Sequence, residues 1–266
     1  MTDVGESPGS ASRHLVILPT GEDVAKYVAR LLADAIRVQP AVCLGLATGG
    51  SMVPVYRRLV GLIRSKRLDT SFVTTFNLDE YVGLPGHHPQ SYHAYMRQHL
   101  FEPGGFSASR THIPDGMAED LPAACEAYDA DIRQAGGIEL QLLGLGPNGH
   151  IGFNEPGTAA EALTHVVDLT QETRRANARF FRTGDTPVPH RAITMGLGTI
   201  MEARRIVVVV TGRAKAAILA HVLTGDPSSR YPATILRRHG HVLWCVDRSA
   251  ASNLPPLEAH CTPSPP

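Results

Sequence analysis

The sequence predicts an α/β fold built around an open, mostly parallel β-sheet. Short apolar runs alternate with segments of helical periodicity along most of the chain, which is the pattern of repeated βαβ units. The chain has 266 residues, 43% of them hydrophobic and 19% charged, so it can bury a substantial core in one large domain or two small ones. These fractions exclude a disordered, collagen-like or coiled-coil chain.

The charge balance limits the classes of partner. The 25 Lys and Arg residues equal the 25 Asp and Glu residues, and this formal net charge of zero argues against a nonspecific binder of nucleic acid or of anionic membranes. Lysine is rare, because only Lys26, Lys66 and Lys215 occur. A lysine that lies next to a candidate site is therefore informative about the function of that site.

The two ends of the chain differ from its centre. Residues 1–13 are small and polar, and residues 251–266 are rich in proline, so we expect a disordered N-terminal tail, one domain over 14–250 and a proline-rich C-terminal tail. The four cysteines are scattered, which indicates reduced thiols and not a disulfide framework. The longest aliphatic run, 206–210, is too short to cross a bilayer, and we expect a cytoplasmic protein.

Four elements are expected near the N-terminus. They are a strand over 14–18, a helix over 22–37, a strand over 41–46 and a helix over 51–65. Thr20 can cap the first helix, with Asp23 in the return position of a capping box. Pro40 separates that helix from the next strand, and a glycine turn leads into the second helix.

The alternation continues to the end of the chain. A strand over 71–78 should end in an acidic loop, and Pro122 suits the first turn of a helix over 120–134. The other expected elements are helices over 91–100 and 213–223 and strands over 140–143, 192–195, 206–210 and 241–246. Open parallel sheets bind ligands beyond the carboxyl ends of their strands, so the segments directly after the strands are the candidate site.

The first such segment is a glycine-rich turn after the strand 41–46. Backbone N–H groups of Gly49, Gly50 and Ser51 would lie at a helix N-terminus, where unsatisfied donors and the helix dipole favour a phosphate. The same glycines would equally suit a plain strand-to-helix turn. The segment is not a P-loop, because the Gly-Lys-Ser/Thr ending is missing.

The second segment carries two adjacent acids, Asp79 and Glu80. Acids at the end of a strand are often only solvated, but the flanking residues here are apolar. Apolar neighbours would partly desolvate a carboxylate and raise its pKa toward the range of a general base. Asp79 is therefore a candidate base.

The third segment, 143–156, presents a histidine in a glycine-rich loop. Its glycines match the dinucleotide pattern G-x-G-x-x-G, but the Asn-Glu-Pro that follows cannot open the long helix of a dinucleotide site. His150 has Asn148 two residues before it and Glu155 five residues after it. A histidine between two hydrogen-bonding groups is a candidate acid–base group, because they can fix its tautomer and tune its pKa.

Further signals concern cations and metals. Lys215 opens a helix after the aliphatic strand 206–210, at the same edge of the sheet. His239 and His241 could share one strand face, but no third ligand is evident, so we expect no metal site. Four arginines lie in one exposed-looking segment: Arg174, Arg175, Arg179 and Arg182.

Together these segments resemble the glucosamine-6-phosphate deaminase (isomerase) family, from about residue 15 to residue 246. The resemblance rests on L-G-L-x-T-G-G-S at 44–51, F-N-L-D-E-Y-V-G-L at 76–84, Ser91-Tyr92, G-x-x-G-H-I-G-F-N-E-P-G at 146–157, T-R-x-A-N-x-R-F-F at 173–181 and G-x-x-K at 212–215. Several motifs in this order make it specific.

The resemblance implies a Rossmann-like single domain with helices on both faces of the sheet and an active-site lid over about 158–182. It also implies a reaction of amino-sugar catabolism without a cofactor or metal, in which D-glucosamine 6-phosphate and water give D-fructose 6-phosphate and ammonia. Asp79 would move a proton between C2 and C1 of the open-chain sugar, and His150 would assist ring opening, supported by Asn148 and Glu155. The residues implied for the phosphate are Gly49, Gly50, Ser51, Arg179 and Lys215.

Two departures from the family pattern lead to expectations. Asn148 stands where some members have aspartate, and an amide oxygen cannot neutralise an imidazolium, so we expect a lower His150 pKa than in those members. Some members are activated by N-acetylglucosamine 6-phosphate, held by basic and hydroxyl residues at an interface. We expect no such activation, because the residues at the corresponding stretch of this chain would bind a phosphate poorly. These residues are Thr158, Ala159, His165 and Val167.

Alternatives stay open. A 6-phosphogluconolactonase has the same fold and a similar histidine loop, but usually continues with a Ser-Leu-Phe-Pro-like stretch where this chain has Phe-Asn-Glu-Pro at 153–156. Galactosamine 6-phosphate is an alternative substrate. A sugar-phosphate sensor domain of a transcription regulator is disfavoured, because residues 1–13 are too short for a helix-turn-helix. The expected partner is a small sugar phosphate, neither nucleic acid nor membrane, and a homo-oligomer is compatible with the sequence.

Overall fold

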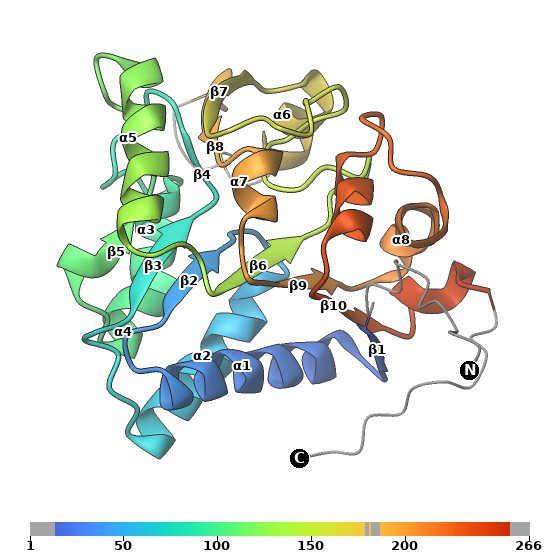
Figure 1. The fold of residues 1–266 in the computed structure, drawn as a ribbon, viewed down its shortest axis with the longest axis horizontal. Coiled ribbons are helices and arrows are strands. Elements are labelled where there is room, and N and C mark those ends of the chain that lie inside the picture. The colour runs from blue at the N-terminus through green and yellow to red at the C-terminus, as the bar shows by residue number, and fades with distance from the viewer. Residues whose placement is uncertain (1–13, 179–180, 182–186, 256–266) are drawn as a thin grey trace, which may run out of the picture.

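A computed structural model describes residues 14–178, 181 and 187–255 of the chain. Within them, seven parallel strands form the central sheet in the order β1-β10-β9-β6-β2-β3-β5 (Figure 1). The strands are β1 (His14–Leu18), β2 (Cys43–Leu46), β3 (Thr74–Asn77), β5 (Thr111–His112), β6 (Leu140–Gly144), β9 (Arg205–Val210) and β10 (Val242–Asp247). This confirms the open, mostly parallel α/β sheet predicted from the sequence.

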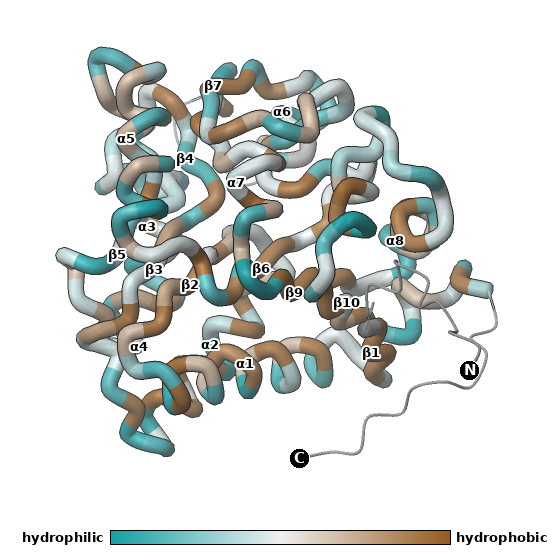
Figure 2. The backbone as a smooth tube through the Cα atoms, in the orientation of Figure 1, coloured by the Kyte–Doolittle hydropathy of each residue, from teal (hydrophilic) through white to brown (hydrophobic). Residues whose placement is uncertain are grey.

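Helices cover both faces of this sheet, as expected. In the view of Figure 1, α1 (Gly21–Val38) and α2 (Met52–Lys66) lie below it, and α5 (Leu121–Gln134) and α7 (Leu197–Met201) lie above it. The remaining helices are α3 (Tyr92–Met96), followed by one turn of π-helix over Arg97–Phe101, α4 (Glu102–Gly104), α6 (Gln171–Ala178) and α8 (Ala216–Thr224). Figure 2 shows hydrophobic residues concentrated along the central strands and on the inner sides of the helices.

The start of α1 illustrates how sequence signals place an element. Thr20 is the N-cap: its hydroxyl oxygen accepts from the backbone N–H of Asp23 at 3.2 Å and its hydroxyl donates to the Asp23 carboxylate at 2.6 Å. The apolar face of α1 is fully buried against the core at Val24, Val28 and Leu32. The predicted boundaries of α1 and α2 are each within one residue of those observed.

A second sheet corrects the expectation of an acidic loop after 71–78. Asp79 and Glu80 belong to strand β4 (Asp79–Tyr81), which pairs antiparallel with β8 (Arg191–Thr194), and β8 pairs with β7 (His165–Asp168). Leu78 explains the change: its N–H donates to Leu46 of the central sheet at 2.9 Å, and its carbonyl accepts from Met195, after β8, at 2.6 Å. The chain passes from one sheet to the other at this residue.

The remaining predictions concern the lid segment, the cysteines, the two tails and the absence of a membrane span. Strand β7 and helix α6 occupy the segment expected to be a lid, and neither was predicted. Three of the cysteines, Cys43, Cys125 and Cys245, are free and buried, and Cys261 lies outside the described residues. The predicted N-terminal tail also lies outside the described residues, and of the predicted C-terminal tail only residues 251–255 are described. No helix in the described part is long and apolar enough to span a membrane.

Candidate active site

The predicted site residues meet in one cavity of about 720 Å³ beyond the carboxyl ends of the central strands. Those that line it are Gly49, Gly50, Ser51, Asp79, Asn148, His150 and Lys215. Glu155 is not among them, but its carboxylate accepts a hydrogen bond from the amide group of Asn148, which lines the cavity. Arg179 and Arg182 lie outside the described residues, so their predicted positions stay predictions. Parallel strands explain the convergence, because all their carboxyl ends point to the same edge of the sheet.

Asp79 is a carboxyl group removed from water. Its residue is 5% exposed, and its Oδ1 has no hydrogen-bond partner in the described part of the chain. Burial, and secondly the nearby charge of Glu80, raise the pKa of Asp79 to about 8. The raised pKa expected from the apolar flanks is confirmed, and it suits a group that takes and returns a proton.

Glu80, the neighbouring acid, has a different task. Its carboxylate accepts hydrogen bonds from the backbone N–H groups of Tyr92 and His93, both at 3.0 Å, and lies 2.9 Å from Nδ1 of His93. It also accepts from the N–H of Tyr81. Glu80 therefore caps the N-terminus of α3 and ties that helix to β4, beside Asp79.

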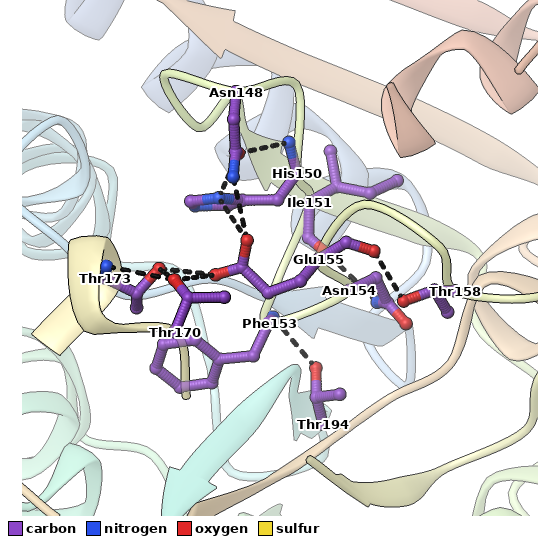
Figure 3. A network of polar contacts seen from close by, with 10 residues as sticks. All are labelled: Asn148, His150, Ile151, Phe153, Asn154, Glu155, Thr158, Thr170, Thr173 and Thr194. Atoms are coloured by element: carbon purple, nitrogen blue, oxygen red, sulfur yellow. Dashed lines mark hydrogen bonds and ion pairs between the residues drawn. The ribbon is translucent and has the colours of Figure 1, made fainter. Parts of the chain in front are cut away.

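His150 is oriented by a chain of polar contacts (Figure 3). Its Nδ1 lies 2.6 Å from Oδ1 of Asn148, and Nδ2 of Asn148 donates to Oε2 of Glu155 at 2.8 Å. Because the amide nitrogen of Asn148 donates to Glu155, its amide oxygen faces the imidazole ring. Nδ1 of His150 must then be the protonated nitrogen. Nε2 is left with its lone pair.

The environment of His150 favours its neutral form. Burial lowers the pKa of His150, and the charge of Lys215 lowers it further against the opposing effect of Glu155. The comparison with relatives that carry aspartate at position 148 stays a prediction. Close packing also requires a glycine next to the ring, since a Cβ at Gly146 would lie 2.2 Å from ring atoms of His150.

The same cavity is lined by the described groups predicted for a phosphate. Gly49 has φ of +105°, a conformation that favours glycine, and its carbonyl accepts from the Tyr95 hydroxyl at 2.8 Å. Ser51 stands at the N-cap of α2 without a side-chain capping bond. Lys215 lies in a short 3-10 helix before α8, and burial lowers its pKa.

The cavity-lining residues that were not assigned from the sequence include Tyr92, Glu172, Thr173 and Asn177. The last three belong to α6. The motifs containing Tyr92 and α6 contributed to the resemblance, but nothing in their spacing indicated that they face this cavity. Asn177 donates to the Tyr81 hydroxyl at 3.0 Å, and the Tyr92 hydroxyl donates to that of Tyr81 at 3.4 Å. These side chains link α6 to the strand that carries Asp79.

Metal ligation finds no support among the described residues, where no three His, Cys, Asp or Glu side chains gather. Both ring nitrogens of His239 are engaged: Nδ1 accepts from the N–H of His241 at 3.1 Å, and Nε2 lies 2.7 Å from the Ala203 carbonyl. The pair at 239 and 241 is therefore a structural contact.

A parallel sheet with an acid, a histidine and a lysine gathered beyond its strand ends has the architecture of an α/β enzyme. The family model described as Glucosamine-6-phosphate isomerases/6-phosphogluconolactonase matches residues 20–244, and the chain belongs to this family.

Relatives within the family are similar over most of their length. A glucosamine-6-phosphate deaminase of Rhodopirellula baltica is 51% identical over 240 residues, covering 90% of this chain and 94% of the relative. One of Halothermothrix orenii is 47% identical, covering 87% and 96%. A solved structure of a monomeric glucosamine-6-phosphate deaminase matches with a TM-score of 0.87 at 43% identity, covering 90% of this chain and 99% of that chain.

A more distant likeness concerns the fold alone. The 6-phosphogluconolactonase of Trypanosoma brucei matches with a TM-score of 0.72 at 22% identity, covering 92% of this chain and 99% of that chain.

Proposed function

We propose that this protein converts D-glucosamine 6-phosphate and water to D-fructose 6-phosphate and ammonia. One observation carries the proposal: Asp79, with a pKa raised to about 8, lines the same cavity as an oriented His150 whose neutral form is favoured. The similarity to deaminases at 51% and 47% identity supports the substrate.

Ring opening is the task proposed for His150. Its Nε2 carries a lone pair because Nδ1–H is turned toward Asn148. Nε2 can take the proton of the sugar's O1 hydroxyl and return it to the ring oxygen, which breaks the bond between C1 and that oxygen. Asn148 and Glu155 keep the imidazole in the tautomer that this transfer needs.

Isomerisation is the task proposed for Asp79. As a carboxylate it removes the proton on C2, which lies next to the C1 carbonyl of the open chain, and delivers it to C1. The amino group at C2 then becomes an imine, and the proton that it loses balances the one that the C1 carbonyl oxygen gains on becoming a hydroxyl. Water adds to that carbon, ammonia leaves, and fructose 6-phosphate remains.

The phosphate would be held in the same cavity by the glycine turn and Lys215. The turn at Gly49, Gly50 and Ser51 leads into α2, whose dipole favours an anion at its N-terminus, and Lys215 adds a positive charge. Arg179 is part of the same proposal. A dianion bound away from the reacting carbons supplies binding energy that orients the sugar. A cytoplasmic location and a place in N-acetylglucosamine catabolism complete the proposal.

One assay tests both the reaction and the base. Purified protein is incubated with glucosamine 6-phosphate, and ammonia and fructose 6-phosphate are measured together. We expect equal amounts of both products, and in Asp79→Asn a loss of kcat of about 10²- to 10⁴-fold, the usual contribution of a general base.

Parallel reactions separate the alternatives. Faster turnover of galactosamine 6-phosphate would change the substrate, and hydrolysis of 6-phosphogluconolactone without ammonia release would favour the lactonase. If Asp79→Asn released ammonia at the wild-type rate, the assignment of the base would be wrong.

A further inference from the structure

We propose that Thr173 is a positioning residue of the reaction, which holds His150 in its working tautomer by acting through Glu155. This inference rests on the proposed function and adds to it a residue of α6. Glu155 is 6% exposed, and its two carboxylate oxygens have separate partners. Oε2 accepts from Asn148 at 2.8 Å, whereas Oε1 accepts from the hydroxyl of Thr173 and, at 3.5 Å, from that of Thr170 (Figure 3).

The hydrogen bonds converge on the carboxylate of Glu155 from two sides. Thr173 O–H donates to Glu155, the Asn148 amide donates to Glu155, and the imidazole N–H of His150 donates to Asn148. An ionised carboxylate only accepts, so Glu155 fixes which end of the Asn148 amide faces it. The other end, Oδ1, then faces His150. The backbone N–H of His150 also donates to Oδ1 of Asn148, at 3.2 Å, so Glu155 and this N–H together set the amide orientation and with it the tautomer of His150.

Without the Thr173 hydroxyl, one oxygen of Glu155 would lose the hydrogen bond that it accepts from Thr173. The carboxylate could then rotate, and Oε2, already 3.7 Å from Nδ1 of His150, would no longer be held on the Asn148 amide. An amide free to turn can present its NH₂ group to Nδ1, which demands the tautomer protonated on Nε2. That tautomer has no lone pair on Nε2 to accept a substrate proton.

Helix α6 presents the Thr173 hydroxyl from a fixed position. At its start, the Thr170 side chain accepts from the backbone N–H of Thr173 at 3.2 Å. Toward its end, Asn177 donates to the hydroxyl of Tyr81, two residues from Asp79. Thr173 also lines the cavity. The same helix therefore contacts the support of His150 and the strand of Asp79.

Three variants isolate the hydroxyl. Thr173→Val removes it while keeping the branched shape and a similar helix propensity, and Thr173→Ser keeps it without the methyl group. Thr158→Val is the matched control: its hydroxyl also bonds Glu155, but at the backbone carbonyl, which still accepts from the Thr158 N–H at 3.1 Å. Melting temperatures identify any variant that does not fold, and Thr173→Ala then replaces Thr173→Val.

Kinetics with glucosamine 6-phosphate give the first result. We expect Thr173→Val to lower kcat about tenfold to a hundredfold while KM changes less than about threefold, because the hydrogen bond that is lost runs to Glu155, a charged group that does not line the cavity. Thr173→Ser should stay within about threefold of wild type, and Thr158→Val should match it. A Thr173→Ser variant as slow as Thr173→Val would overturn the proposal, as would an unchanged kcat in Thr173→Val.

The tautomer of His150 gives a second result that needs no substrate. In ¹⁵N-labelled protein, with His150→Gln to assign the signal, we expect wild type to be protonated on Nδ1 and Thr173→Val to populate the form protonated on Nε2. An unchanged tautomer in Thr173→Val would overturn the proposal. If glucosamine 6-phosphate is not turned over by wild type, the proposed reaction fails, and the tautomer still decides the role of Thr173.

Discussion

Asp79 shows, at the scale of one residue, that a group suited to catalysis can lower the stability of the folded protein. Its pKa is about 8 in the folded protein against a reference value of 3.8, because the buried carboxyl group resists ionisation. A carboxyl group with a raised pKa stabilises the folded state when it is protonated. That stabilisation is complete below about pH 4 and is lost as the pH rises through about 8.

Asp79→Asn should therefore be more stable than wild type at alkaline pH. We expect its melting temperature to exceed that of wild type by roughly 3 °C or more near pH 9, and the difference to shrink toward about pH 4, since 1 kcal/mol corresponds to roughly 2–4 °C in a chain of this size. Calorimetry between these pH values measures it. Asp69→Asn is the control, because Asp69 is exposed and its pKa is lowered. Parallel curves for Asp79→Asn and wild type would contradict the expectation.

Individual residues also show what a sequence can predict about a site. The apolar neighbours of Asp79 and the partners of His150 were visible in the sequence, and both gave the correct surroundings. The separate task of Glu80 was not visible, because it depends on backbone N–H groups of α3, twelve and thirteen residues away. Hydrogen bonds of that kind have no signature in residue spacing.

At the scale of elements, the turn before α2 depends on one of its two glycines. Gly49 has φ of +105°, whereas Gly50 is not among the positive-φ glycines, and a Cβ at either position would meet nothing within 4 Å. The demand at Gly49 is therefore conformational and not steric.

Gly49→Ala should lower the free energy of unfolding by about 1–3 kcal/mol, the cost of a side chain in a strained backbone conformation. Gly50→Ala should leave it within about 0.5 kcal/mol of wild type. Urea unfolding of both variants tests the difference. Since the turn faces the cavity, we also expect Gly49→Ala to raise KM for the phosphorylated substrate more than it lowers kcat. Equal stabilities of the two variants would show that the turn tolerates a side chain at Gly49.

Helix α6 and strand β4 are among the elements that escaped prediction, and each did so for a physical reason. Helix α6 has the sequence QETRRANA, which offers no apolar stripe, because it packs through threonine and asparagine hydroxyl and amide contacts. Strand β4 is only three residues long and begins with two acids, which local preference assigns to a loop. Its pairing with β8, more than a hundred residues later, overrides that preference.

For the whole molecule, alternation of strands and helices was enough to predict the central sheet and to gather the site at one edge. What the sequence did not predict was the position of α6 over that edge, since α6 reaches Glu155 and Tyr81 by side-chain contacts alone. These contacts place Thr173 and Asn177 beside a cavity built by residues from six other parts of the chain.

Regulation is a property of the whole molecule, and we expect none by N-acetylglucosamine 6-phosphate. The Thr158 hydroxyl already donates to the backbone carbonyl of Glu155, and Val167 packs against the apolar cluster around Tyr81. Initial rates against glucosamine 6-phosphate should follow a hyperbola that the acetylated sugar phosphate leaves unchanged. A sigmoidal curve that becomes hyperbolic on its addition would disprove this.

The passage of the chain at Leu78 sets a limit on how this protein can vary. Side chains alternate between the two faces of a strand, so one inserted or deleted residue between Asn77 and Asp79 would turn the carboxylate to the opposite face. The backbone of Leu78 is held in both sheets, its N–H by Leu46 and its carbonyl by Met195, and no loop is present to absorb the change. Surface turns can therefore gain or lose residues over evolution, whereas the distance along the chain from the central sheet to the base cannot change.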